Sequence, residues 1–438
     1  MKPSLRGRPR AKERSTTDVI VIGAGMAGVS AARELVAAGF SVCVVEGRDR
    51  VGGRVQSIRD FCGEPVEAGA EFVHGVGAAT WPELRAAGLA VRPCPLMRHT
   101  LFNVGGGTRW LPWILMHPGV WPSFTILRKI GRFEPHDISA REFVERRGYR
   151  GRARILAEMT LSAHLPGSID EIGMQGLLED GVLKLEIGLN HRVVEGYDSL
   201  PAFIARGLDL RLGFGVEALA WGPDGVVLRS HDGQEISARA AVSTLPVGVL
   251  QSGAVHFTPE LPESKRSALE RIGMGPVVKL LLRFQEPFWP GWAANIGCGT
   301  GPVTLYWPVF YGSEGKPPVL AAYATGPRAA RLSAASEEEA TQIVVSDLAR
   351  LFPEADPRRT LSASRRIDWA ADPHSCGGYT FLRSGGAGAR ALLAAADTPP
   401  LFWAGSATAR SPIAATVEAA YTSGLRAAAE VRKFLGAG

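Results

Sequence analysis

The stretch GAGMAG, residues 23–28, places three glycines at the spacing G-x-G-x-x-G. In a turn between a buried strand and a helix, the first glycine allows a tight bend and the second lets backbone N–H groups approach a pyrophosphate. The third lets the helix pack closely on the strand, and the partial positive charge of the helix N-terminus faces the phosphates. The stretch therefore predicts a dinucleotide site, with phosphate-binding residues Gly23, Gly25, Met26, Ala27 and Gly28.

An acid and a second pair of glycines follow at distances that narrow the choice of dinucleotide. Glu46 lies about 20 residues beyond the turn, where an acid accepts hydrogen bonds from the ribose hydroxyls of the adenosine. The chain then continues as GRDRVGGR. Its glycines permit close backbone approach and its last arginine can contact phosphate or a ring system, which suits a cofactor longer than NAD. We therefore expect FAD, held in this segment by Glu46, Gly47, Arg48, Gly53 and Arg54.

Two strands and a helix must position these residues. Asp18–Ile22 is a short apolar run, typical of a buried parallel strand. The pattern of Met26–Ala38 predicts a helix that Gly39 ends, and Ser41–Glu46 is a second buried strand. A strand–turn–helix–strand unit with a right-handed crossover belongs in a parallel sheet.

Other elements are predicted at separated places in the chain. A β-rich stretch covers residues 210–250, with hairpin turn signals at Gly222–Gly225 and His231–Gly233. Further patterns predict helices at Ile138–Arg147, Arg152–Ala163, Glu263–Arg271, Glu337–Leu351 and Ala414–Leu435, and strands at Val277–Phe284 and Leu401–Gly405.

The composition is that of a globular protein of two or three domains. The 438 residues are 46% hydrophobic and 21% charged, with a net charge of +6 whose clusters lack the aromatic interleaving of a nucleic-acid surface. No apolar run approaches the ~20 residues of a membrane helix, and no signal peptide is expected. The five cysteines form no CxxC pair, which suggests a reducing compartment without a disulfide framework or metal site. We expect a cytoplasmic protein that binds neither nucleic acid nor membrane.

Six stretches of the chain resemble the flavin-dependent amine oxidase family, which includes monoamine oxidases, polyamine oxidases and histone lysine demethylases. They follow the family's order over nearly the whole chain. They are GAGMAG with VVEGRDRVGGR, GAEFVHG at 69–75, residues 215–217 through STLPVGVL at 243–250, KLLLRFQEPFW at 279–289, Trp369 with DPHSCGGYTF at 372–381, and WAGSATARSPIAATVEAAYTSGLRAA at 403–428.

The resemblance implies an α/β fold with a discontinuous Rossmann-type FAD-binding domain plus an α+β substrate-binding domain that has a mixed sheet and helices. We expect a flexible basic tail at 1–17, an FAD-binding domain from 18–80, 196–260 and 370–438, and a substrate-binding domain from 81–195 and 261–369. The further cofactor-binding residues that it implies are Gly69, Ala70, Glu71, Phe72, Val216 (at the adenine), Trp369, Gly405, Ser406, Ala415, Thr416 and Val417.

The chain departs from the family's patterns at several positions. Gly378 stands where monoamine oxidases attach FAD through a cysteine, and Cys376 is offset by two, so the expected FAD is non-covalent. Thr416 replaces the second tyrosine of the monoamine oxidase cage, and Ser406 replaces an acid in the closing motif. The arginine that L-amino-acid oxidases carry near Phe72 is not found, which disfavours an amino-acid substrate.

The catalytic residues implied by the resemblance are Lys279, His74 and Tyr379. Family members carry a lysine at the position of Lys279, linked through a water to flavin N5, whereas the pattern VVKLLLRF alone favours an edge-strand lysine with its amine in solvent. His74 is placed as in animal polyamine oxidases; without the resemblance, a loop histidine bonded to backbone is the better interpretation. Tyr379 and Trp369 are either cavity walls suited to an amine or core aromatics. Glu71 is either a pocket carboxylate or an exposed charge.

The predicted function is FAD-dependent oxidation of a primary or secondary amine, a polyamine among the candidates, to an imine, with hydride transfer to flavin N5 and reduction of O2 to hydrogen peroxide. The predicted partners are thus a small-molecule amine and O2. Two alternatives stay open. One is a flavin desaturase or tailoring oxidase acting on a non-amine or a natural product. The other is a non-catalytic flavoprotein that serves as a binding module.

Overall fold

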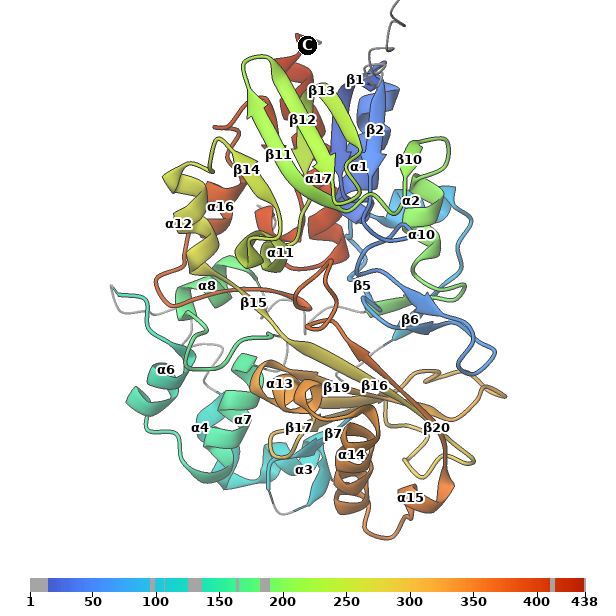
Figure 1. Ribbon diagram of the computed structural model, residues 1–438. Helices are drawn as coiled ribbons and strands as arrows, with labels where there is room; N and C mark the ends of the chain where they lie inside the picture. The colour runs from blue at the N-terminus through green and yellow to red at the C-terminus, as the bar shows by residue number, and fades with distance from the viewer. Residues whose placement is uncertain are drawn as a thin grey trace, which may run out of the picture.

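The computed structural model describes residues 15–94, 99–105, 107–124, 136–162, 165–181, 190–409 and 414–436. Two large sheets, of eight and seven strands, dominate this part of the chain and occupy the upper and lower halves of Figure 1. Helices and three small sheets complete it. The mixed α/β class that the sequence predicted is confirmed. Within the described residues, no helix is long and apolar enough to cross a bilayer.

The eight-stranded sheet carries the glycine turn at the end of strand β1. Its order is β10 (Asp209–Arg211), β2 (Val42–Val45), β1 (Ser15–Ile22), β13 (Glu235–Ser243), β12 (Gly225–Ser230), β11 (Val216–Gly222) and β14 (His256–Thr258), and β22 (Leu401–Trp403) also pairs with β13. β1 runs parallel to both neighbours, β2 and β13. Val19, Ile20, Val21 and Ile22 are all buried, because this strand is covered on both faces.

Helix α1 (Met26–Ala37) begins directly after the glycine turn and packs against α17 (Val417–Phe434), near the end of the chain. The Ser30 hydroxyl donates to the Tyr421 carbonyl at 3.1 Å. A Cβ on Gly424 would overlap Ser30 Oγ, so glycine at this position lets the two helices approach. The contact brings the last segment of the chain beside the first glycine turn.

The seven-stranded sheet contains strand β16 (Val277–Phe284), which has the predicted bounds. The order is β20 (Leu361–Asp368), β16, β19 (Val319–Thr325), β18 (Leu305–Pro308), β17 (Asn295–Cys298), β7 (Thr100–Asn103) and β8 (Thr108–Trp110). β16 is therefore an interior strand, antiparallel to β19 and β20. An edge-strand position for Lys279, which its local pattern favoured, is wrong.

Alternation along β16 decides which way Lys279 faces. Leu280 and Leu282 belong to the core that also contains Val344 and Leu348 of helix α14 (Glu337–Leu351), whereas Leu281 belongs to a different core. Because successive side chains of a strand point to opposite faces, Lys279 shares the face of Leu281, away from α14. Figure 1 shows α14 and α13 (Gly326–Ala334) covering one side of this sheet.

The remaining elements are three small sheets and a set of mostly short helices. The small sheets are β5 (Val73–His74), β9 (Asn190–Val193) and β6 (Val91–Cys94); β15 (Ile272–Gly275) and β21 (Tyr379–Leu382); and β3 (Ser57–Ile58) and β4 (Val66–Glu67). The other helices are α2 (Trp81–Ala86), α3 (Leu111–Met116), η2 (Pro118–Val120), α4 (Trp121–Phe124), α6 (Ala140–Arg146), α7 (Gly151–Ser162), α8 (Met174–Glu179), α10 (Ser199–Ile204), α11 (Val247–Ser252), α12 (Glu263–Arg271), α15 (Pro357–Thr360), α16 (Ala389–Ala394) and η3 (Ser406–Thr408).

The structure corrects two sequence-based expectations about the chain's organisation. Residues 15–17, which were assigned to the flexible tail, belong to β1 and pair with residues 236–238 of β13; residues 1–14 lie outside the described part. The elements predicted between residues 81 and 195 were helices, at Ile138–Arg147 and Arg152–Ala163, yet this segment also supplies β7 and β8 to the seven-stranded sheet and β6 and β9 to a small sheet. Short strands of mixed polarity have no local signature, because their pairing partners lie far away in sequence.

Candidate active site

One cavity of about 630 Å³ is lined by residues from both large sheets. Its walls include all but one of the residues that the sequence analysis singled out for cofactor binding or catalysis; the exception is Gly28. The members that line it are Gly23, Gly25, Met26, Ala27, Glu46, Gly47, Arg48, Gly53, Arg54, Gly69, Ala70, Glu71, Phe72, His74, Val216, Lys279, Trp369, Tyr379, Gly405, Ser406, Ala415, Thr416 and Val417.

Gly25 and Gly28 of the stretch GAGMAG are glycines for different structural reasons. A Cβ on Gly28 would overlap the Gly23 carbonyl oxygen, so Gly28 is required by the packing of α1 on β1. By contrast, apart from its two chain neighbours, no atom of the described residues lies within 4 Å of the place where a Cβ of Gly25 would be, and its φ of −72° suits any residue. Protein packing therefore does not require glycine at position 25, whereas a ligand that closely approaches the backbone does. This open cradle at the N-terminus of α1 fits the pyrophosphate of a dinucleotide.

Glu46 lies buried beside this turn and ties it together. Its Oε2 accepts a hydrogen bond of 2.8 Å from the Ala24 N–H, and its Oε1 accepts one of 2.9 Å from the Arg48 N–H. The Arg48 guanidinium in turn donates to Asp372 at 2.6 Å and to Ser375 at 2.9 Å. These two contacts join the stretch VVEGRDRVGGR to the stretch DPHSCGGYTF at the cavity wall. The sequence alone did not indicate them.

Arg54 places a cation in the cavity without a carboxylate in direct contact among the described residues. Its Nη1 donates to the Gly378 carbonyl at 2.8 Å. Burial, with a smaller contribution from the positive charge of Arg48, lowers the pKa of Arg54 to about 10. A buried guanidinium of this kind is suited to an anionic cofactor group. Position 378 itself carries no sulfur, and a Cβ there would overlap Val277, so no thioether can tether a flavin at this residue.

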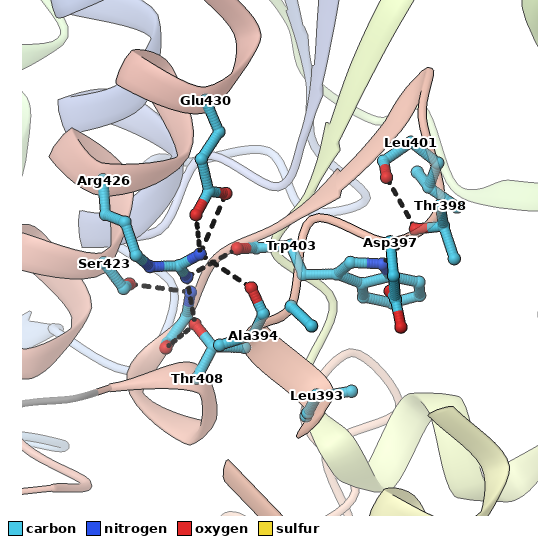
Figure 2. Close-up of polar contacts among 12 residues, drawn as sticks. Leu393, Ala394, Asp397, Thr398, Leu401, Trp403, Thr408, Ser423, Arg426 and Glu430 are labelled. Atoms are coloured by element: carbon cyan, nitrogen blue, oxygen red, sulfur yellow. Dashed lines mark hydrogen bonds and ion pairs between the residues drawn. The ribbon is translucent and has the colours of Figure 1, made fainter. Parts of the chain in front are cut away.

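The closing segment forms a second cradle. Gly405 has a φ of +119°, which favours glycine, and its N–H donates to Ser423 Oγ at 2.9 Å. Figure 2 shows Arg426 of α17 bound on one side by Glu430 and on the other by the Trp403 carbonyl, at 2.7 Å, and by Thr408 Oγ1, at 3.0 Å. These bonds fix both ends of the loop that carries Gly405 and Ser406.

The start of α17 meets the same cavity. Thr416 caps the helix by accepting a hydrogen bond of 3.1 Å from the Ala419 N–H. Ala415, directly before it, has a φ of +61°, a left-handed conformation that is uncommon for a residue with a Cβ. The cap and the strained residue present the positive end of an 18-residue helix to the cavity. Thr416 therefore has a capping role, where monoamine oxidases have a tyrosine.

Lys279 is buried, with 3% of its surface exposed, and lines the cavity from β16. Its Nζ donates to the carbonyls of Glu67, at 2.8 Å, and Gly69, at 3.1 Å. It also donates to Glu71 Oε2 at 3.2 Å. The interpretation of Lys279 as a lysine with its amine in solvent is therefore wrong.

Glu71 is a buried carboxylate rather than an exposed charge. It contacts Lys279, the Arg192 guanidinium at 2.8 Å, and the Trp307 indole N–H at 3.0 and 3.1 Å. Arg192 was missed by the sequence analysis, because its strand β9 has no local signal. Its guanidinium carbon lies 5.1 Å from the centre of the Phe72 ring, so a cation does lie near Phe72, although Glu71 neutralises it.

Aromatic side chains form the wall around Lys279. The hydroxyls of Tyr379 and Tyr323 are hydrogen-bonded at 2.8 Å, and burial raises the pKa of both. Trp369 donates from its indole N–H to the Ala68 carbonyl at 3.1 Å. His74 Nδ1 shares a hydrogen bond of 2.9 Å with the side-chain oxygen of Asn190. Neutral phenols, indoles and apolar residues such as Phe102, Leu156 and Met159 make this region suited to an organic substrate.

Comparisons with known proteins agree with this geometry. A family described as flavin containing amine oxidoreductase matches residues 26–432. Polyamine oxidase 2 of Arabidopsis thaliana is 32% identical over 453 residues, which cover 97% of this chain and 89% of that protein. Polyamine oxidase 4 of Oryza sativa subsp. japonica is 31% identical over 445 residues, covering 96% and 89% respectively.

Two solved structures share the fold at low sequence identity. A putrescine oxidase bound to putrescine has a TM-score of 0.83 at 20% identity and covers 95% of this chain and 99% of its own. Cyclohexylamine oxidase from Brevibacterium oxydans also has a TM-score of 0.83 at 20% identity, over 96% and 99%. The chain belongs to the family of flavin-containing amine oxidoreductases, which confirms the predicted cofactor, FAD, and the predicted class of enzyme, an FAD-dependent amine oxidase.

Proposed function

We propose that the protein oxidises a primary or secondary amine, a polyamine among the candidates, to an imine, with O2 as the electron acceptor and hydrogen peroxide as its product. The observation that carries the proposal is the buried Lys279 Nζ in the wall of a cavity that also contains the two glycine cradles. Bound FAD supplies the hydride acceptor at N5 and passes the electrons on to O2. Lys279 would hold a water beside the reacting groups, because an amine N–H is a hydrogen-bond donor.

The charges of the cavity favour the neutral form of the substrate amine, whose lone pair assists hydride loss. Each carboxylate among its described lining residues already has partners: Glu46 has backbone N–H groups, Glu71 has two cations, and Asp180 has Arg390 at 2.6 and 2.8 Å. Transfer of an ammonium into apolar surroundings without a counter-charge is unfavourable, so the bound amine would lose its proton.

Aromatic residues and His74 would orient the substrate. Tyr379 and Trp369 line the cavity, and we expect their rings to contact the amine and its carbon chain, with the Tyr379 hydroxyl held by that of Tyr323. The hydrogen bond to Asn190 fixes the His74 ring at the cavity wall. We propose that His74 contacts the substrate or adjusts its protonation.

Anaerobic mixing of the purified holoenzyme with a panel of monoamines, diamines and polyamines tests the proposal. We expect loss of the oxidised flavin absorbance with at least one amine, followed by peroxide formation on admission of O2. Bleaching only by non-amine compounds would favour a desaturase or tailoring oxidase. A flavin that no compound in a broad panel bleaches would favour the binding module.

Replacing Lys279 by Met tests the residue that carries the proposal. Met keeps an unbranched side chain in β16 but cannot hold a water, so we expect flavin reoxidation by O2 to slow by about 100-fold, a magnitude typical of lost proton-transfer assistance. The control is Lys433→Met, at an exposed position in the last turn of α17. Unchanged reoxidation and turnover in Lys279→Met would remove Lys279 from the mechanism.

A further inference from the structure

Three buried charged side chains form a chain that leads from Arg192 through Glu71 to Lys279. The exposed fractions of these residues are 7%, 6% and 3%. Arg192 comes from β9 and Lys279 from β16, and the Glu71 carboxylate lies between them at 2.8 Å from Arg192 Nη2 and 3.2 Å from Lys279 Nζ. Two buried cations thus share one carboxylate, although buried charges are normally paired one to one.

Glu71 is fully engaged by this chain. Oε1 forms the ion pair with Arg192 Nη2 at 2.8 Å and accepts a hydrogen bond from the Trp307 indole at 3.0 Å, while Oε2 accepts from Lys279 and from the same indole at 3.1 Å. Both oxygens are held in place from three sides, so the carboxylate cannot turn toward a substrate without breaking a buried charged contact. Its geometry suits the support of Lys279.

The other carboxyl group beside Lys279 does not supply a second negative charge at neutral pH. Burial, opposed by hydrogen bonds from Tyr197 and Ser57, raises the pKa of Glu67 to about 8. Lys279 contacts the backbone carbonyl of Glu67 and not its carboxyl. Among the described residues, Glu71 is therefore the carboxylate in direct contact with the Lys279 amine.

All three hydrogens of a protonated Lys279 are directed to acceptors of the protein. An ammonium has three donors, and the three acceptors are the carbonyls of Glu67 and Gly69 and the carboxylate of Glu71. The bond to Glu71 is the longest of the three, at 3.2 Å, and Arg192 competes for the same carboxylate. The hydrogen bond to Glu71 is therefore the one that a water molecule could replace most readily as an acceptor from Lys279.

We propose that Glu71 and Arg192 are positioning residues that act in opposite directions on Lys279, Glu71 by stabilising its ammonium form and Arg192 by drawing Glu71 away from it. This inference rests on the proposed role of Lys279 in the reaction with O2. Removal of Glu71's charge leaves the ammonium without a carboxylate and beside Arg192. When the charge of Arg192 is removed, Lys279 no longer shares the Glu71 carboxylate with a second cation.

The experiment compares the pH dependence of four variants and the parent holoenzyme. The flavin is reduced photochemically, so no amine substrate is needed, and its reoxidation by O2 is followed across the pH range. A second readout, independent of turnover, is the pH titration of the oxidised flavin's absorbance spectrum. Both are measured for Glu71→Gln, Arg192→Met, Arg192→Lys and Lys279→Met. The titratable and charged groups around Lys279, Glu71 and Arg192 include Glu67, Tyr323 and Tyr379 on the Lys279 side and Cys94 and Arg92 on the Arg192 side.

We expect the inflection of both pH profiles to move to lower pH in Glu71→Gln and to higher pH in Arg192→Met, by about 1 pH unit or more each. Arg192→Lys should keep the parent inflection, and Lys279→Met should lose it. A fifth variant, Glu67→Gln, should also keep the parent inflection, and that result would exclude Glu67 as the titrating group. Inflections that move in the same direction, or that do not move, would overturn the proposal.

Arg192→Met decides the question alone if Glu71→Gln does not fold. Failure of the amine proposal is recognised separately, because the amine panel would then not bleach the flavin while the photochemical profiles would still respond to the variants.

Discussion

At the scale of single residues, Glu67 links the cavity wall to the pH dependence of stability. Only 8% of the residue is exposed, and its carboxyl accepts hydrogen bonds of 2.8 Å from the Tyr197 N–H and the Ser57 hydroxyl. Burial raises its pKa in the folded protein to about 8 from the ordinary 4.5. Between pH 4.5 and about pH 8, Glu67 therefore keeps its proton in the folded state and has lost it in the unfolded state.

The sign of the effect follows from proton linkage. Below pH 4.5 both states hold the proton, and above about pH 8 neither does. Between these values the folded state binds more protons, so the free energy of unfolding falls as the pH rises, by at most about 1.4 kcal/mol per pH unit. Gln resembles the neutral acid in shape and does not titrate. We expect Glu67→Gln to lack this contribution.

The measurement is the free energy of unfolding in urea for the parent and Glu67→Gln, between about pH 5 and about pH 8. The parent should lose stability relative to the variant as the pH rises. Glu339 offers a matched control, since Glu339→Gln changes an exposed helix-capping acid whose pKa is lowered, chiefly by the Ser336 N–H. Parallel curves for the parent and Glu67→Gln would contradict the prediction.

At the scale of elements, the turn between β1 and α1 contains two glycines with separable roles. Gly28→Ala places a methyl group on the Gly23 carbonyl and must move α1 away from β1, so we expect a loss of stability and of FAD together. The added methyl group of Gly25→Ala has open space among the described residues, so we expect the fold to persist while FAD binding weakens. The two variants are matched, because each adds one methyl group to the same turn.

Thermal unfolding of the FAD-free proteins and FAD titration separate these outcomes. The unfolding temperature of Gly25→Ala should lie close to that of the parent, and that of Gly28→Ala clearly below it. The FAD dissociation constant should rise by about tenfold or more in Gly25→Ala, equivalent to roughly 1.4 kcal/mol. If Gly25→Ala binds FAD as the parent does, the cradle is not the pyrophosphate site.

Elements with strong local signals were the predictable part of the fold. Helix α14 has a capping box at Ser336 and Glu339, and strands β1 and β2 contain continuous apolar runs; sequence patterns indicate these elements. Strand β9 could not be found in the same way. Three of its four residues, NHRV, are polar, and the strand pairs with β5 and β6, about 100 positions earlier in the sequence. Arg192 was missed for this reason.

The same distinction between local signals and distant contacts applies to the residues of the site. Glycines, Glu46 and Lys279 lie in motifs whose spacing or family resemblance identifies them. The bonds of Arg48 to Asp372 and of Glu71 to Arg192 join segments separated by more than a hundred residues, and no spacing in the chain records them. The sequence therefore predicted which residues line the cavity better than it predicted which partners hold them.

At the scale of the whole molecule, the cavity joins the two large sheets. One end is lined by residues of the eight-stranded sheet and its turns, such as Gly25 and Val216, and the other by residues of the seven-stranded sheet, such as Lys279 and Trp307. We expect FAD to contact both ends, and ADP to contact the glycine turn alone. FAD should then stabilise both sheets against local opening, whereas ADP should stabilise the first.

Hydrogen exchange of the FAD-free protein, with and without each ligand, measures this difference. At a ligand concentration 100 times its dissociation constant, binding adds about 2.7 kcal/mol to the free energy of every opening that releases the ligand. We expect FAD to slow exchange in β13 and in β19, and ADP at the same saturation to slow it in β13 only, because an opening of β19 need not release ADP. Protection confined to β13 with both ligands would mean that the cofactor does not couple the sheets. Lys279, which pairs with Tyr323 of β19, would then lie outside the reach of the flavin.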